Sequence, residues 1–261
     1  MKLLLTLLVL QLSTILSAQW VQKGIDIDGE AAINQSGFSV SMADANTLAI
    51  GAIGNGGNGI FAGHVRIYEW NGTAWVQKGA DIDGEAAGDQ SGVSVSMADA
   101  NTLAIGANGN DGNVAGAGHV RIYEWSGTAW VQKGADIDGE ASADGSGLSV
   151  SMADANTLAI GATDNDGNGV NFNAGHVRVY EWSGTAWVQK RADIDGEAAG
   201  DLSGISVSMV DRNTLAIGAI GNDGNGNGGV TFESTNGVEP PGFKKEQTSM
   251  AKLPVIYRAN R

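Results

Sequence analysis

The segment SVSMADANTLAIGA, at residues 94–107, determines how the rest of the chain is interpreted. It recurs unchanged at residues 39–52 and 149–162, and as SVSMVDRNTLAIGA at 206–219. A second segment recurs at a similar period, because WVQKG begins at Trp20, Trp75 and Trp130 and WVQKR begins at Trp187. Such repetition is typical of stacked or radially arranged structural units. We therefore predict a repeat region over residues 19–237, with copies near 20–74, 75–129, 130–186 and 187–237.

Each copy contains four short apolar runs separated by turn-forming residues. In the second copy these runs cover residues 92–98, 102–107, 119–125 and 128–133. Val95 and Met97 alternate with serines, and this period of two indicates a β-strand with one apolar face. The pattern predicts four antiparallel strands in each copy.

The connection between the third and fourth runs predicts a tight hairpin. Asn71-Gly72 stands between two apolar runs, and such a pair favours a turn with two positive φ angles. This turn would place Tyr68 opposite Trp75, and the same register would pair Tyr123 with Trp130 and Tyr180 with Trp187. We interpret these aromatic side chains as cross-strand packing rather than as ligand-binding platforms.

Four antiparallel strands in every 40–55 residues are typical of a propeller blade. We predict an all-β protein, a β-propeller-type array of about four four-stranded antiparallel blades that forms an incomplete propeller or a small ring. The fourth copy has no clear WVQKG strand after residue 230. Residues 20–23 would then supply the outermost strand of a composite fourth blade.

The motifs SGxSVSMA, NTLAIGA and AGHVRIYEW together resemble the FG-GAP repeat, the blade unit of integrin-α-type propellers, in a secreted, Bacteroidota-like variant. The resemblance extends from residue 20 to about residue 230 and implies an extracellular role in adhesion or recognition. The family's calcium loop would fall at Asp44, Asp99, Asp154 and Asp211. The connections there are only ADAN or VDRN, each with one carboxylate, so that calcium site is not carried over. The family's usual seven blades also exceed the four copies present.

Composition excludes several classes of protein. The chain has 261 residues, with 15 Lys+Arg against 29 Asp+Glu, and its net charge of −14 argues against a nucleic-acid partner. It has no cysteine, which excludes disulfides, thiolate metal sites and a cysteine nucleophile. Residues 1–18 have the layout of a secretory signal peptide, and no later segment has the run of about 18 apolar residues that would insert into a membrane. We expect a secreted product, extracellular or at the cell surface, with a basic, proline-containing and disordered tail at residues 238–261.

The loop DIDGEAAGD is the candidate metal site. Acids at alternate positions beside a glycine resemble the opening of a calcium loop, although the glycine comes earlier and no carboxylate follows at the twelfth position. The alternative is a solvated turn that binds no cofactor. The calcium candidates in the three full copies of this loop are Asp81, Asp83, Glu85, Asp89, Asp136, Asp138, Glu140, Asp144, Asp193, Asp195, Glu197 and Asp201.

His64, His119 and His176 occupy one position in three copies, which is a pattern suggestive of a three-histidine metal site. Equivalent positions on the third strands of successive blades would be too far apart to bind a single ion. No catalytic residues are predicted, because every serine and carboxylate candidate recurs unchanged from copy to copy. Active sites in propellers normally combine different residues from different blades.

We therefore predict a secreted, non-enzymatic protein for adhesion or for recognition of an extracellular protein or polysaccharide. Identical loops could bind a polymer several times, so that avidity supplies the strength. An extracellular carbohydrate-active hydrolase or lyase is the alternative from another class. A further alternative is a truncated fragment of a larger FG-GAP repeat protein with no independent function. Unpaired blade edges also favour self-association.

Overall fold

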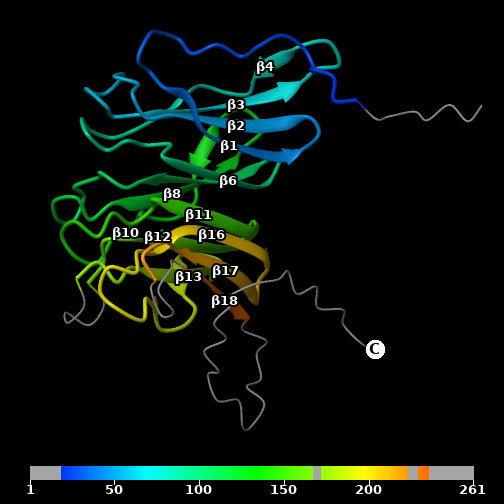
Figure 1. The fold of residues 1–261 in the computed structure, drawn as a ribbon. Coiled ribbons are helices and arrows are strands. Elements are labelled where there is room, and N and C mark those ends of the chain that lie inside the picture. Colours follow the sequence, from blue (N-terminus) through cyan, green and yellow to red (C-terminus); the bar gives the residue numbers. More distant parts are fainter. Residues whose placement is uncertain (1–18, 167–171, 223–228, 235–261) are drawn as a thin grey trace, which may run out of the picture.

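The computed structural model describes residues 19–166, 172–222 and 229–234, and the last of these segments is described by its backbone alone. The expected signal peptide and the whole of the expected tail lie outside these residues. The described chain is all-β, as predicted, and forms four antiparallel sheets, which we call blades 1 to 4 (Figure 1). None of its elements is a helix long and apolar enough to cross a membrane.

Blades 1 to 3 each have five strands. Blade 1 contains β1 (Ser36–Asp44), β2 (Thr47–Ala52), β3 (His64–Trp70), β4 (Trp75–Gln77) and β5 (Ile82–Asp83). Blade 2 contains β6 (Ser94–Asp99), β7 (Thr102–Ala107), β8 (His119–Trp125), β9 (Trp130–Gln132) and β10 (Ile137–Asp138). Blade 3 contains β11 (Ser149–Asp154), β12 (Thr157–Ala162), β13 (His176–Trp182), β14 (Trp187–Gln189) and β15 (Ile194–Asp195). Blade 4 contains β16 (Ser203–Asp211), β17 (Thr214–Ala219) and β18 (Gly229–Ser234).

The four strands predicted for a full copy form a meander. In blade 1 the order is β1-β2-β3-β4, and the short β5 pairs with the other end of β3. The outer edge of the third strand is thus shared by two short strands, since β4 pairs near Trp70 and β5 pairs near His64. The fifth strand was not predicted. It matters because it carries the acidic loop to the start of β3.

The hairpin between β3 and β4 has a different register from the predicted one. Trp70 pairs with Trp75 and Tyr68 pairs with Gln77, so the expected Tyr68–Trp75 pairing is wrong. Only Gly72 has a positive φ, of 101°, and the Oδ1 of Asn71 accepts hydrogen bonds from the backbone N–H groups of Thr73 and Ala74. The central residues of the turn are therefore Gly72 and Thr73 instead of Asn71 and Gly72, and each cross-strand partner shifts by two residues.

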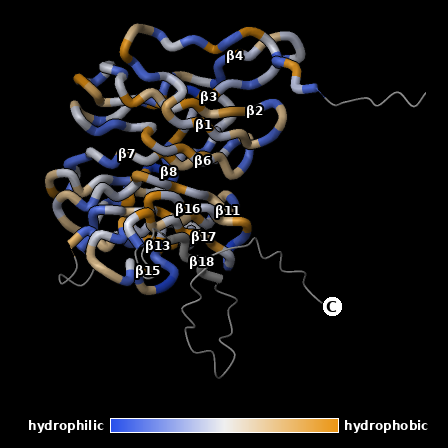
Figure 2. The backbone as a smooth tube through the Cα atoms, in the orientation of Figure 1, coloured by the Kyte–Doolittle hydropathy of each residue, from blue (hydrophilic) through white to orange (hydrophobic). Residues whose placement is uncertain are grey.

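Successive blades stack face to face through their first strands. At the junction of blades 1 and 2, Val95 and Met97 join Val65 and Ile67 in one buried cluster. The backbone N–H of Met97 donates to Ser41 Oγ at 2.9 Å, and the same bond recurs at the next two junctions. Figure 2 shows hydrophobic and hydrophilic residues alternating along these stacked strands. The core is thus a series of layers, one for each pair of neighbouring blades.

The array is open. Blade 1 lies at one end of the stack and β18 at the other (Figure 1), and none of the sheets closes on itself. Residues 20–23 form no strand, and the described part of blade 4 is a sheet of three strands. The predicted composite fourth blade is therefore not formed. The physical reason is the direction of the stack, which carries the two ends of the repeat region away from each other.

Candidate functional sites at the blade junctions

Each of the first three blades buries a histidine at the first position of its third strand. His64, His119 and His176 are each only 1% exposed. Each lies against two acidic side chains whose oxygens are within 4.8 Å of the imidazole nitrogen and of one another. We call these sets the histidine–acid groups; they are Glu30/His64/Asp81, Glu85/His119/Asp136 and Glu140/His176/Asp193.

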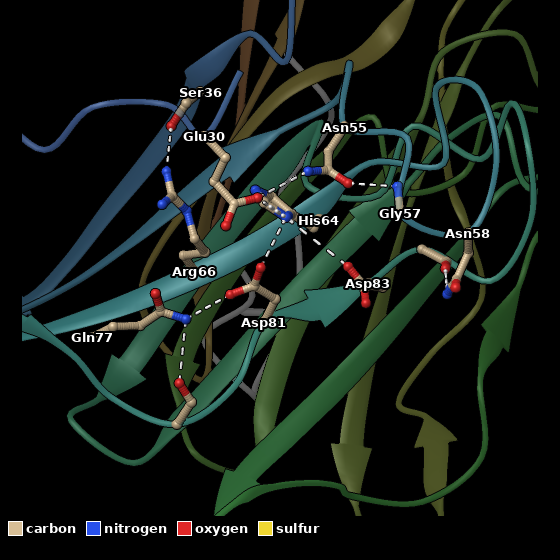
Figure 3. Close-up of polar contacts among 12 residues, drawn as sticks. Glu30, Ser36, Asn55, Gly57, Asn58, His64, Arg66, Gln77, Asp81 and Asp83 are labelled. Atoms are coloured by element: carbon tan, nitrogen blue, oxygen red, sulfur yellow. Dashed lines mark hydrogen bonds and ion pairs between the residues drawn. The ribbon is translucent and has the colours of Figure 1, made fainter.

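Figure 3 shows the first histidine–acid group. The Nδ1 atom of His64 lies 3.4 Å from Asp81 Oδ2, 3.9 Å from Glu30 Oε2 and 4.0 Å from Asp83 Oδ1. This buried nitrogen has no hydrogen-bond partner. Burial lowers the pKa of His64 below 6.5, even though the neighbouring carboxylates Asp81 and Glu30 act to raise it. The imidazole is therefore neutral at pH 7, and it faces partly exposed carboxylates.

The acidic loop between blades 1 and 2 divides its residues between two groups. Asp81 and Asp83 face His64 of blade 1, whereas Glu85 lies 3.9 Å from the Nδ1 of His119 in blade 2 and 3.6 Å from Arg121. The Nη2 of Arg121 also donates to the backbone carbonyl of Asp83 at 2.7 Å. The loop is therefore a connector between two blades rather than a single chelating ring.

The last acid of each predicted calcium loop has a local structural role. Asp89 is 2% exposed, and its Oδ2 accepts hydrogen bonds from the backbone N–H groups of Glu85 and Ala86. Asp144 does the same in the next copy, and Asp201 accepts from Ala198. Of the remaining candidates, Asp138 and Asp195 lie on β10 and β15, paired with His119 and His176, and Glu197 follows β15 and is exposed. The predicted set of four acids does not converge on one ion in any copy.

Each histidine–acid group can nevertheless supply three protein donors, one nitrogen and two carboxylate oxygens. Atoms bound to a tetrahedral zinc ion at about 2.0–2.2 Å lie about 3.3–3.6 Å apart. His64 Nδ1 lies at similar distances from the two oxygens, 3.4 Å from Asp81 and 3.9 Å from Glu30, and the three donor atoms all lie within 4.8 Å of one another. Calcium takes about six to eight oxygens, so three donors fit it poorly. Each group holds a single histidine, consistent with the expectation that the three do not share an ion.

The connection between the first and second strands of each blade, where the FG-GAP resemblance would place a calcium loop, is a tight turn. Asp44 Oδ1 accepts the backbone N–H of Asn46 at 2.7 Å, and Asp99, Asp154 and Asp211 make the same contact with Asn101, Asn156 and Asn213. In each turn this carboxylate holds the β-hairpin together.

A small depression lies beside the acidic loop at two successive junctions. The first, of about 240 Å³, is lined by Asp81, Asp83, Tyr123, Ala129 and Trp130, together with Ala80 and Ile82. The second, of about 210 Å³, is lined by the equivalent residues of the next copy, including Asp136, Asp138, Tyr180, Ala186 and Trp187. The two depressions are therefore copies of one surface.

The tryptophan of this depression is held in place by its neighbours. Trp130 Nε1 donates to the carbonyl of Lys78 at 2.8 Å, and its ring packs against Trp125 with centroids 5.4 Å apart. Lys78 Nζ lies 5.6 Å from the Trp130 ring and donates to the carbonyl of Ala100. The depression thus presents a half-buried, preorganised aromatic edge beside two carboxylates. The sequence pattern favours packing for these tryptophans and does not predict the depression, because β5 brings the acids there.

No protein-family model matches the chain, and no curated protein matches it. Among solved structures, the chain is similar to hydrazine synthase from Kuenenia stuttgartiensis, with 15% sequence identity and a TM-score of 0.46. That similarity covers 70% of this chain and 49% of the other, so the chain spans about half the length of its structural neighbour.

Proposed function

We propose that this chain is a secreted, non-enzymatic repeat protein of the FG-GAP kind that recognises a polysaccharide at the cell surface. The observation that carries the proposal is the repeated depression, in which a tryptophan, a tyrosine and two aspartates recur at successive junctions. Small-molecule sites combine apolar and aromatic surface with a few well-placed polar groups, and this combination suits the C–H face and hydroxyls of a sugar ring.

Charge favours a neutral polymer as the ligand. The chain carries a net charge of −14, and each depression has two aspartates at its wall. An anionic polysaccharide would be repelled by this field. Hydroxyl groups of a neutral glycan, in contrast, can donate hydrogen bonds to the carboxylates. Two equivalent sites on one rigid stack would bind consecutive segments of the same polymer, and avidity would strengthen the binding.

A binding role is favoured over hydrolysis because the copies are chemically equivalent. The acids, the tyrosine and the tryptophan are the same in both depressions. Catalysis of glycoside hydrolysis needs two carboxyl groups with different protonation states and roles. Neither Asp81 nor Asp83 has surroundings that set it apart from its equivalent in the next copy. We expect no release of reducing sugar from any polysaccharide that the protein retains.

The test fills the depressions without disturbing the core. Ala129 and Ala186 are exposed residues of the β8–β9 and β13–β14 turns and line the two depressions. We expect Ala129→Arg combined with Ala186→Arg to abolish retention of the full chain in affinity electrophoresis through gels containing neutral β-glucans or xylans. The matched control is Thr128→Arg with Thr185→Arg, which adds the same charges on the same turns outside the depressions. Unchanged retention by the alanine variant, or retention by no neutral polysaccharide, would refute the proposal.

A further inference from the structure

The N-terminal end of the stack exposes a face that the inner blades bury. On β1, Phe38, Val40 and Met42 are 53%, 65% and 58% exposed. Their equivalents in blade 2, Val93, Val95 and Met97, are 8%, 9% and 7% exposed because blade 1 covers them. Blade 1 has the same SVSMAD strand sequence, but no blade covers this face in the described part of the chain.

The C-terminal end exposes the complementary face. Val210 of β16 is 77% exposed, whereas the equivalent Ala43 and Ala98 pack into the clusters between blades. Ala216 of β17 is partly exposed, although its equivalents in the first three blades are fully buried. Each end of the stack therefore presents one half of the junction that the chain forms three times internally.

The edges of the sheets are complementary as well. Blade 4 has three strands in the described part of the chain and lacks the fourth strand that WVQ forms in the other blades. Residues 20–22 have the sequence WVQ but form no strand, and Trp20 is 100% exposed. The residue that follows this segment, Lys23, makes the same contacts as its equivalents at the internal junctions. Its Nζ lies 5.0 Å from the ring of Trp70 and donates to Asn46.

We propose that a second copy of this chain docks head to tail, its β1 face on the β16–β17 face of the first, and adds residues 20–22 to blade 4 as the missing fourth strand. The occupant follows from continuity with the internal junctions, because both halves of the same interface are present on one chain. Such an interface is heterologous, so association can continue beyond a dimer.

The internal junctions fix the contacts of the docked pair. Ser41 Oγ accepts the N–H of Met97, and the equivalent serine at the open end is the exposed Ser208, which would accept the N–H of Met42 in the next copy. Ser94 Oγ donates to the carbonyl of Gly147 at 2.7 Å, and the exposed Ser206 would donate to Gly37 in the same way.

A glycine at the open end leaves room for this contact. A Cβ at Gly106 would overlap the carbonyl oxygen of Gly147 in the following blade. At the equivalent Gly218, the three nearest atoms that such a Cβ would meet among the described residues belong to the side chains of Ser206 and Ile205 in blade 4 itself. Gly218 thus provides the space for a following blade, which a second copy would supply and which the described part of this chain does not contain.

The experiment measures the mass of the purified full chain in solution against concentration, by sedimentation velocity and light scattering. We expect a series of species that lengthens with concentration. Val40→Lys blocks the N-terminal face and Val210→Lys blocks the C-terminal face, and each variant alone should lose all species above the monomer. Both positions are exposed, so the variants should keep the circular dichroism spectrum and melting temperature of the wild-type monomer.

Mixing the two variants distinguishes head-to-tail docking from any other association. Each variant keeps the face that the other lacks, so an equal mixture should form a dimer and nothing larger. Val131→Lys is the matched control, because Val131 is 53% exposed on the central blade 2, and it should assemble like the wild type. A wild-type chain that stays monomeric, single variants that still associate, or a mixture that does not dimerise would each overturn the proposal.

Discussion

At the scale of single residues, the most restrictive feature of the stack is the close approach of the backbones of neighbouring blades. In the first three LAIGA segments the glycine lies where the backbone of the next blade crosses, and Gly106 faces the carbonyl oxygen of Gly147. Gly106→Ala forces these two strands apart, so we expect a loss of about 1–3 kcal/mol in the free energy of unfolding, the usual cost of overpacking. Urea denaturation measures it.

The last copy of the same strand provides the control for this substitution. Gly218→Ala brings the new carbon against the side chain of Ser206, which can rotate away. Its cost in dilute protein should stay below about 1 kcal/mol, within the range of ordinary surface changes. If the two variants lose the same free energy of unfolding, the glycine is not required for the close approach of neighbouring blades.

The buried histidines make stability depend on pH. Burial lowers the pKa of His64, His119 and His176 below 6.5 in the folded chain. As the pH falls below 6.5, the unfolded chain binds protons at these residues before the folded chain does. The free energy of unfolding should therefore fall with decreasing pH in the window between 6.5 and the folded pKa values, by at most about 1.4 kcal/mol per pH unit for each histidine.

His119→Gln should remove the contribution of one histidine to the pH dependence of the free energy of unfolding. Urea denaturation at pH values from 7.5 to about 5 measures this dependence, and Thr128→Ala should leave it unchanged. Burial raises the pKa of Glu140, and that shift acts with the opposite sign, adding stability only as the pH approaches the ordinary pKa of 4.5. A slope that is the same in wild type and His119→Gln would contradict the assignment of acid sensitivity to the buried imidazoles.

At the scale of elements, the strands followed from the sequence and the connections did not. The alternation in SVSMAD and the run TLAIGA predict β6 and β7, because local patterning sets which face is apolar. The predicted hairpin register was wrong by two residues because Asn71 caps the turn through its side chain instead of adopting a positive φ. A dipeptide rule cannot distinguish these two uses of asparagine.

The histidine–acid groups were missed for a different reason. Asp81 reaches His64 because β5 folds back onto β3, while Glu85, four residues later, crosses to His119 in the next blade. Sequence proximity grouped these acids into one loop, and tertiary structure divides them. The separation in sequence between each histidine and its acids recurs from copy to copy. That recurrence is the sequence signal that could have indicated these non-local contacts.

At the scale of the whole molecule, each blade is stabilised by its neighbours, as in other repeat arrays. β7 is buried along its whole length, whereas β17 alternates between buried and partly exposed residues. In β1 the side chains of Phe38, Val40 and Met42 are exposed, and those that face blade 2 are only partly buried. We therefore expect amide hydrogen exchange to be slowest in blades 2 and 3 and faster in β1 and in β16–β18, since the end blades can open without the centre. Hydrogen-exchange mass spectrometry at low protein concentration measures this order.

If head-to-tail docking occurs, a higher protein concentration should slow exchange selectively in β1 and β16. Val40→Lys should abolish this slowing of exchange. Exchange at one uniform rate along the chain would instead mean that the four blades unfold as a single cooperative unit.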